Sequence, residues 1–138
     1  MTSRSFLDTN VLVYSVDMGE QAKRAIARAL LAGAGPGTLA VSSQVLGEFY
    51  VTVTRKLRSP IAIEIAAAIV QHLASLPCVP VDTVLVRSAI DRSRTGQVAY
   101  WDALIIEAAL AAGCTTLLTE DLTAGQRFDG LTVVNPFA

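Results

Sequence analysis

Charged residues are scarce in this sequence. Asp, Glu, Lys and Arg make up 17% of its 138 residues, against roughly 25% in an average soluble domain. The 11 basic and 12 acidic side chains leave a formal net charge of −1, which excludes a protein that coats nucleic acid through a global positive field. A nucleic-acid partner would therefore have to bind a local basic patch. The apolar content of 52% excludes a disordered chain.

Long hydrophobic runs are also absent, although the mean hydropathy is +0.49. The two long uncharged stretches, residues 29–47 and 65–81, are interrupted by glycines, prolines or a histidine. Neither contains the ~20 consecutive apolar residues that a membrane-spanning helix needs. The first eight residues lack the basic start, apolar segment and cleavage site of a secretory signal. We therefore expect a soluble protein of the cytoplasm.

Cysteine and histidine are nearly missing. Cys78 and Cys114 form no CxxC motif and have no histidine nearby that would suggest a metal site. We expect two buried thiols in a reducing compartment rather than a disulfide. The one histidine, His72, has no neighbour at metal-ligand spacing and is expected to be a solvated side chain.

Short β-branched segments alternate with longer stretches rich in Ala, Leu and Ile, and no linker or repeat divides them. This alternation predicts a single three-layer α/β/α domain over residues 1–138. Parallel strands need helical crossovers, so we expect a parallel sheet with helices on both faces, which also explains the low charge. The expected strands are residues 5–7, 39–42, 79–81, 115–118 and 132–134, and the expected helices are residues 20–32, 43–57, 61–76, 83–94 and 101–112.

The expected helix 61–76 is unusually apolar. Its polar residues fall on one narrow stripe, and the rest of the helix is almost entirely Ile, Ala, Val and Leu. This pattern favours a helix sunk deep in the core. The alternative is that part of its apolar face meets another chain.

Four acidic residues occupy notable positions in this arrangement. Asp8 directly follows the strand 5–7, and Asp121 closes the run that begins with the strand 115–118. Functional sites of open parallel sheets lie beyond the carboxyl ends of the strands, so we expect both carboxylates at one edge. Asp102 opens a helix and Glu48 lies within one, each among apolar neighbours.

Taken singly, these acids have simpler explanations: Asp8 and Asp102 can cap helices, Asp121 can begin a turn and Glu48 can face solvent. Their combination favours a site, because a carboxylate in an apolar run is costly without a partner. No Lys or Arg lies within four positions of Asp102. If the acids converge, a divalent cation is the simplest compensation for their repulsion, and carboxylate oxygens suit Mg²⁺ or Mn²⁺.

With these motifs the chain resembles a PIN-domain ribonuclease of the VapC toxin group. The resemblance extends over nearly the whole chain. It implies a five-stranded parallel sheet in the order 3-2-1-4-5 between helices, and an acidic quartet of Asp8, Glu48, Asp102 and Asp121 that holds the metal and catalyses the reaction. The matching parts, in chain order, are Asp8-Thr9-Asn10, Glu48, Trp101-Asp102-Ala103-Leu104-Ile105 and Leu118-Thr119-Glu120-Asp121.

One position departs from the family pattern. Many members carry a further aspartate three residues beyond the position of Asp121, where this chain has Ala124. Asp121 is expected to supply the fourth ligand, and Glu120 is the alternative, since a strand end can project either side chain.

The reaction that the resemblance implies is hydrolysis of RNA phosphodiester bonds, leaving a 5′-phosphate and a 3′-hydroxyl. Thr9, Asn10 and Thr119 flank the acids, so we expect them to orient a carboxylate or to contact the scissile phosphate. Capping of a helix or turn is the alternative for all three.

RNA as the substrate rests on the resemblance, because aromatic residues that stack on bases make up only 6% of the chain. Trp101 is expected to pack rather than to stack on a base. Basic clusters near Glu48 and Asp102 are candidates for binding the RNA backbone, and solvated helix ends are the alternative. These candidates are Arg55, Lys56, Arg58, Arg92 and Arg94.

The resemblance also implies two protein partners: an antitoxin, expected near the helix 61–76 and the helix before it, and a second copy in a homodimer. A non-catalytic PIN-like module that binds RNA or protein is one alternative, which the intact acids disfavour. A DNA nuclease on the same fold is another. A phosphate-accepting receiver domain is disfavoured because no lysine follows the last strand.

Overall fold

The computed structural model describes residues 3–96 and 98–138. Helices and strands alternate along most of the chain, as predicted. The elements in chain order are β1 (Ser5–Leu7), α1 (Thr9–Tyr14), α2 (Gln21–Ala32), β2 (Leu39–Ser42), α3 (Ser43–Val51), the π-turn η1 (Thr52–Lys56), α4 (Ile63–Leu73), β3 (Cys78–Val79), α5 (Thr83–Thr95), α6 (Tyr100–Ala111), β4 (Thr116–Leu118), β5 (Arg127–Phe128) and β6 (Leu131–Val134).

The sheet has the order β3-β2-β1-β4-β6-β5. Its first five strands are parallel neighbours, which confirms the predicted order 3-2-1-4-5. The predicted number of five strands is wrong, because the two-residue β5 pairs antiparallel with β6. Asp129 and Gly130 form the turn between them with φ of 50° and 91°, and Asp-Gly is a strong hairpin signal. A strand of two residues leaves no alternating pattern in the sequence, so only this turn could have predicted it.

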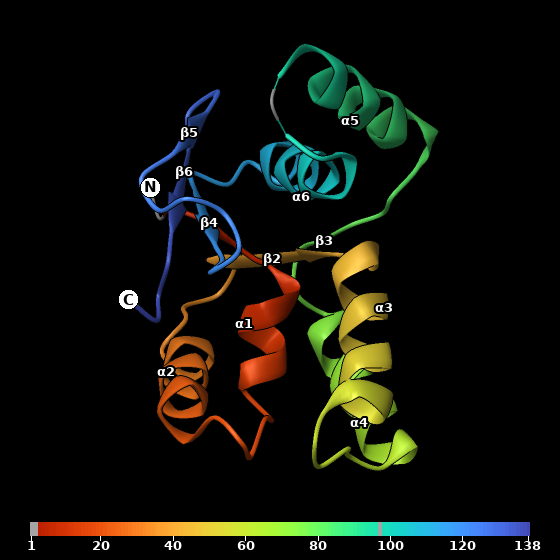
Figure 1. Cartoon of the computed structure of the whole chain (residues 1–138), viewed down its shortest axis with the longest axis vertical. Helices are drawn as coiled ribbons and strands as arrows, with labels where there is room; N and C mark the ends of the chain where they lie inside the picture. Colours follow the sequence, from red (N-terminus) through yellow and green to blue (C-terminus); the bar gives the residue numbers. More distant parts are fainter. Residues whose placement is uncertain (1–2, 97) are drawn as a thin grey trace.

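Helices cover both faces of the sheet. Figure 1 shows α5 and α6 on one side of it and α1 to α4 on the other. The central strands are correspondingly apolar: Phe6 and Leu7 of β1 and Ala40 and Val41 of β2 are fully buried. Burial on both faces removes the need for alternating polar residues in these strands, and it explains the low charge of the whole sequence.

Two helices on the lower side of Figure 1 differ from the prediction. The short helix α1 was not predicted, because it has only six residues and its buried run Val11-Leu12-Val13 is partly β-branched. The predicted helix 43–57 is divided, since α3 ends at Val51 and the chain continues as the π-turn η1.

The interpretation of residues 61–76 as a core helix is wrong. The helix α4 spans only Ile63–Leu73, and within it only Ala66 and Leu73 are buried. Ile63 and Ile65 are 59% and 57% exposed. The reason is its place in the fold: α4 packs against α3 and η1 rather than directly on the sheet. Its apolar face is therefore available to another chain, which was the alternative interpretation.

Within residues 3–96 and 98–138, no helix is both long enough and apolar enough to cross a membrane. Cys78 and Cys114 are free thiols, with Cys114 buried and Cys78 half-buried. His72 is exposed near the end of α4, as predicted.

Candidate active site

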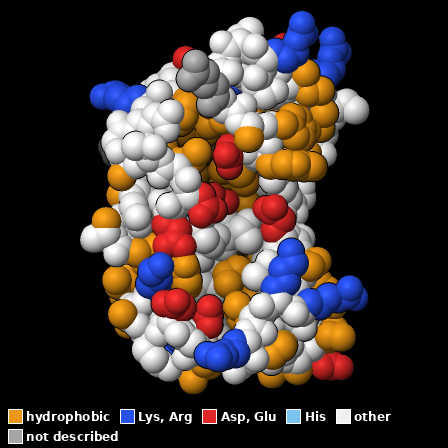
Figure 2. Space-filling view, in the orientation of Figure 1, with side chains coloured by type: hydrophobic (Ala, Val, Ile, Leu, Met, Phe, Trp, Pro, Cys, Tyr) orange, Lys and Arg blue, Asp and Glu red, His pale blue; other side chains and the backbone are white. Residues whose placement is uncertain are grey.

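The acidic residues approach one edge of the sheet. Asp8 follows β1 and Asp121 follows β4, and these two strands are parallel neighbours, so their carboxyl ends lie side by side. Because α6 runs back towards the start of β4, its first turn, with Asp102, lies at the same edge. Glu48 comes from α3, the helix that follows β2. Figure 2 shows acidic side chains gathered across the centre of this face of the molecule.

Asp8 is both a helix cap and a buried carboxylate. Its Oδ1 accepts a hydrogen bond from the backbone N of Thr9 at 2.7 Å, and its Oδ2 accepts one from Oγ1 of Thr119 at 2.8 Å. The residue is 8% exposed. Burial raises the pKa of Asp8 to about 6; the two hydrogen bonds lower it, and the charges of Asp121 and Glu48 raise it. The capping role and the place at the edge of the sheet thus belong to the same side chain.

The other three carboxylates are linked to Asp8 by electrostatic interactions, directly for Asp121 and Glu48 and through Asp121 for Asp102. Burial raises the pKa of Asp102, and the charge of Asp121 raises it further. Glu48 is exposed and accepts a hydrogen bond from Oγ1 of Thr9 at 2.9 Å. Since Asp121 acts on both Asp8 and Asp102, and Glu48 acts on Asp8, the four acids form one electrostatic group. This group is the acidic quartet that the resemblance implies.

Thr119 and Asn10 connect the ends of β1 and β4 by hydrogen bonds. Thr119 is fully buried; its hydroxyl donates to Asp8 and accepts from Nδ2 of Asn10 at 3.1 Å and from the backbone N of Asp121 at 3.0 Å. Nδ2 of Asn10 also donates to Oδ2 of Asp121 at 3.0 Å. Hydrogen bonds of this kind hold carboxylate groups in a fixed orientation.

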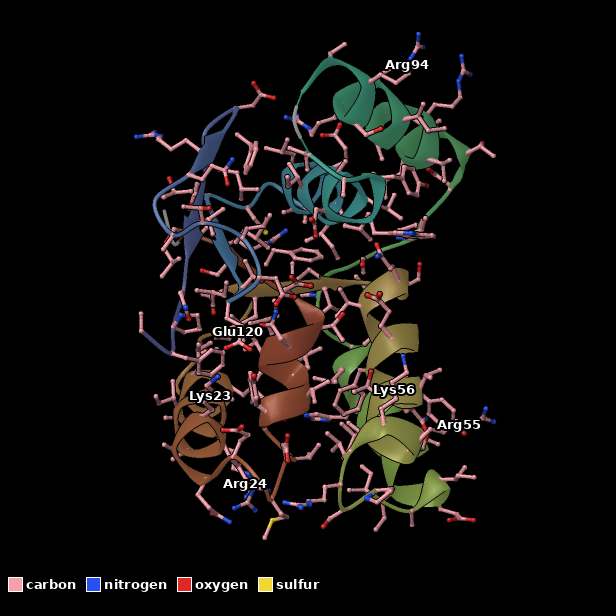
Figure 3. All side chains as sticks on the ribbon, viewed as in Figure 1. Lys23, Arg24, Arg55, Lys56, Arg94 and Glu120 are labelled. Carbon is pink, nitrogen blue, oxygen red and sulfur yellow. The ribbon has the colours of Figure 1, made fainter. Side chains whose placement is uncertain are left out.

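Glu120 turns away from the acidic quartet. Its carboxylate accepts hydrogen bonds from the hydroxyl of Tyr14 and from Nζ of Lys23, the latter at 2.9 Å, and Figure 3 shows Glu120 and Lys23 close together beside α2. Burial acts to raise the pKa of Glu120, but the two hydrogen bonds outweigh it and the pKa is lowered. The sequence could not indicate this contact, since Tyr14 and Lys23 lie 106 and 97 positions from Glu120.

The family model of the PIN domain matches residues 5–126 of this chain. The chain belongs to the PIN-domain family. The matched residues include the whole acidic quartet, together with Thr9, Asn10 and Thr119. No curated protein sequence matches the chain.

Solved structures from toxin–antitoxin systems share this fold over most of their length. The toxin VapC20 of Mycobacterium tuberculosis, described as cleaving the sarcin-ricin loop, is 22% identical, with a TM-score of 0.64 over 82% of this chain and 86% of its own. A toxin–antitoxin complex from Klebsiella pneumoniae is 17% identical, with a TM-score of 0.69 over 96% and 97%. DNA-bound VapBC from Salmonella typhimurium is 21% identical, with a TM-score of 0.62 over 96% and 97%. At such identities the likeness shows the fold.

The basic residues predicted to bind RNA lie in different parts of this PIN domain. Arg55 and Lys56 belong to η1, on the chain segment that continues from Glu48, and Arg58 is exposed just beyond it. Figure 3 shows Arg94 on α5, at the opposite end of the molecule from Arg55 and Lys56.

Two further residues near α6 differ in their accessibility. The guanidinium of Arg92 is held by ion pairs with Glu107 and Asp129, each at 2.7 Å. Trp101 is 65% exposed and meets the ring of Tyr100 edge-on, with 4.9 Å between ring centroids. The packing expected of Trp101 is thus limited to this contact with Tyr100, because the first turn of α6 presents most of the ring to solvent.

The acids of this PIN domain offer only oxygen ligands, which suit a hard divalent cation. Burial is the main cause of the raised pKa of Asp8 and of Asp102, and the negative charge of Asp121 raises both further. A cation would offset this charge, since none of the four acids has an ion pair with Lys or Arg within the described part of the chain. In that same part, no three Asp, Glu, His or Cys side chains already stand together as a metal site. The donor set thus fits the ion, and coordination would require rotation of side chains.

Proposed function

We propose that this PIN-domain protein is a divalent-metal-dependent endoribonuclease and the toxin of a toxin–antitoxin pair. The observation that carries the proposal is the acidic quartet, which four separate segments bring to one edge of the sheet, where its charges act on one another. Membership of the PIN-domain family supports it. The shared fold with VapC20, described as cleaving the sarcin-ricin loop, favours RNA over DNA as the substrate.

The proposed ligands of Mg²⁺ or Mn²⁺ are Asp8 and Asp102, completed by Glu48 and Asp121. When bound, such an ion lowers the pKa of water and offsets negative charge on the phosphate. Asp8 has both carboxylate oxygens oriented by hydrogen bonds, and with a pKa of about 6 it is mostly ionised at neutral pH. A ligand that is already fixed and ionised loses little entropy when it binds a cation.

The remaining steps are assigned to groups on the exposed side of the site. Glu48, which Thr9 holds by a hydrogen bond, is proposed to take the proton of the water that attacks phosphorus. The bond from phosphorus to O3′ then breaks and a proton passes to O3′, which leaves a 5′-phosphate and a 3′-hydroxyl. Asn10 and Thr119 keep Asp121 and Asp8 in place during the reaction.

The test of this function is a cleavage assay on a structured RNA and on DNA of the same sequence. We expect cleavage of RNA with Mg²⁺ or Mn²⁺, none with EDTA, and restoration when excess metal is added back. Equal cleavage in EDTA would exclude the metal-dependent reaction. Cleavage of DNA alone would show that DNA, and not RNA, is the substrate. If the protein binds RNA but cleaves neither nucleic acid, the result would favour the non-catalytic module.

Asp121 and Glu120 are expected to respond differently to removal of their charge. We expect Asp121→Asn to lower the cleavage rate at least about 10-fold with little change in stability, because Asp121 is exposed and its charge acts on Asp8 and Asp102. Glu120→Gln should leave the rate within about twofold and lower the free energy of unfolding by about 1 kcal/mol, because it weakens the contacts with Tyr14 and Lys23. Cleavage rates and urea unfolding of both variants decide the fourth ligand; a larger loss of rate for Glu120→Gln would assign it to Glu120.

The antitoxin is proposed to cover the exposed apolar surface of α4, where Ile63 and Ile65 face solvent. A second apolar surface is a pocket of about 360 Å³ between the ends of α2 and α4, where Leu31, Leu73 and Leu76 form part of the wall. A solved toxin–antitoxin complex with the same fold supports such a partner. A homodimer is proposed as well, on the resemblance to VapC toxins.

A further inference from the structure

A separate pocket opens beside the acidic quartet, along the exposed side of α3. It has a volume of about 350 Å³, within the range of small-ligand sites, and its lining includes Glu48 of the quartet and Thr9, which donates a hydrogen bond to Glu48. A group bound there would lie directly beside the proposed reaction centre. The pocket is lined by Thr9, Gly47, Glu48, Val51, Thr52 and Lys56.

The π-turn η1 brings a cation to this pocket. Lys56 lies eight positions after Glu48, and in an ideal α-helix the two would be about 80° apart around the axis. A π-turn holds more residues per turn, so Lys56 returns to the side of Glu48; the turn is closed by the hydrogen bond from Leu57 N to Thr52 O at 3.2 Å. Within the described residues Lys56 has no ion-pair partner, so its ammonium is available to an anionic ligand.

Arg55 shows that position, and not charge alone, distinguishes Lys56. Both residues belong to the same π-turn, but Figure 3 shows Arg55 projecting outward, away from α1, and it does not line the pocket. In the sequence Arg55 and Lys56 belong to one basic cluster, whereas in the fold only Lys56 of the two lines the pocket.

Gly47 is the second notable residue of this pocket, because packing does not explain why a glycine stands there. It lies inside α3, where glycine lowers helix stability relative to alanine. A Cβ placed on Gly47 meets no atom within 4 Å, so no neighbouring side chain or backbone requires its absence. The open space that this position faces is the pocket itself. A glycine kept at a cost to the helix is understandable if a ligand needs that space.

We propose that this pocket binds one nucleotide of the RNA strand, next to the bond that is cleaved, with a phosphate on Lys56 and the nucleoside against Gly47. The proposal rests on the proposed nuclease activity. The six lining residues include no aromatic ring, so charge and shape hold the nucleotide rather than base stacking. A cation at this point also helps an anionic strand to approach four carboxylates.

The first test removes the cation without changing the helix. For Lys56→Met we expect KM for the RNA to rise about 10-fold with kcat within about twofold, because the ammonium contacts a phosphate remote from the reacting atoms. The slope of log KM against log salt should fall by about 1, since one phosphate contact is lost. Arg127→Met, which removes one exposed cation from β5, serves as the matched control and should change neither quantity.

The second test fills the pocket from the other side. Gly47→Ala and Gly47→Leu should both raise the melting temperature, because both residues favour the helix more than glycine does. KM should rise about 10-fold for Gly47→Leu and much less for Gly47→Ala, as the longer side chain occupies more of the pocket. A stabilised protein with weaker substrate binding cannot be explained by misfolding.

The outcomes separate this proposal from the proposed function. If the wild type cleaves RNA and both Lys56→Met and Gly47→Leu retain its KM within twofold, the nucleotide pocket is wrong and the nuclease stands. If the wild type cleaves nothing, fluorescence anisotropy with a labelled RNA oligonucleotide replaces the rate. Weaker binding by these two variants, but not by Arg127→Met, then supports the pocket, and equal binding by all three overturns it.

Discussion

Replacing Asp8 with asparagine is expected to reduce RNA cleavage on the order of 1,000-fold, which corresponds to about 4 kcal/mol of lost transition-state stabilisation. Asp8 is the most buried of the four carboxylates, and hydrogen bonds orient both of its oxygens. Asparagine keeps the size of the side chain but removes the negative charge that a divalent ion needs. Initial rates of the wild type and the variant on the same RNA, with Mg²⁺ in excess, measure the effect. A variant that cleaves as fast as the wild type would exclude Asp8 as a ligand.

The same substitution should change the pH dependence of stability in the metal-free protein. The pKa of Asp8 is about 6 in the fold, against 3.8 for an ordinary aspartate, so the folded protein binds more protons than the unfolded chain between these values. Stability from this group is therefore complete below pH 3.8 and is lost as the pH rises to about 6. A shift of this size amounts to about 3 kcal/mol. Asparagine has no such titration.

Urea unfolding in EDTA at several pH values tests this directly. We expect the free energy of unfolding of the wild type to fall relative to that of Asp8→Asn by about 3 kcal/mol between pH 3.5 and pH 7. Two parallel curves over this range would contradict the burial of an ionised Asp8. If the curves diverge as expected, Asp8→Asn lowers the cleavage rate at neutral pH but raises stability there. Such a trade-off is common for charged groups gathered for function.

Much of the fold could be predicted because its signals are local. The buried strand Ser5–Leu7 and the helix boundary at Ser43 are visible in short stretches of sequence, and alternation of helices and strands restricts the sheet to few arrangements. The places of two acids are visible for the same reason, since Asp8 directly follows β1 and Asp121 lies three positions after β4. The misassigned parts carry weak local signals: α1 is short and partly β-branched, and β5 has two residues.

The relations between side chains could not be predicted, because they depend on contacts between distant parts of the chain. Nothing local distinguishes Glu120 from Asp121; the fold does so by placing Tyr14 and Lys23 beside Glu120. The exposure of α4 is a second case. An apolar helix in the core and one that faces a partner have the same composition, and only the packing of α4 on α3 separates them.

Thr119 illustrates how such a long-range contact determines the site. Its hydroxyl lies between Asp8, Asn10 and Asp121 and is fully buried. Valine has nearly the same shape but cannot donate or accept a hydrogen bond, so Thr119→Val would leave three polar groups without this partner. We expect a loss of about 1–3 kcal/mol in the free energy of unfolding and a fall in cleavage rate on the order of 100-fold.

The pH profile distinguishes a positioning role of Thr119 from general destabilisation. Its hydrogen bond lowers the pKa of Asp8, so its removal should raise that pKa above 6 and move the acidic limb of the pH–rate profile to higher pH. Thr119→Ser is the matched control, since serine retains the hydroxyl and should keep the limb within about 0.3 pH units of the wild type. If Thr119→Val lost the expected stability but shifted the limb no more than Thr119→Ser did, Thr119 would be a packing residue. If only valine shifts it, the buried hydroxyl sets the charge of Asp8 at the pH where the enzyme works.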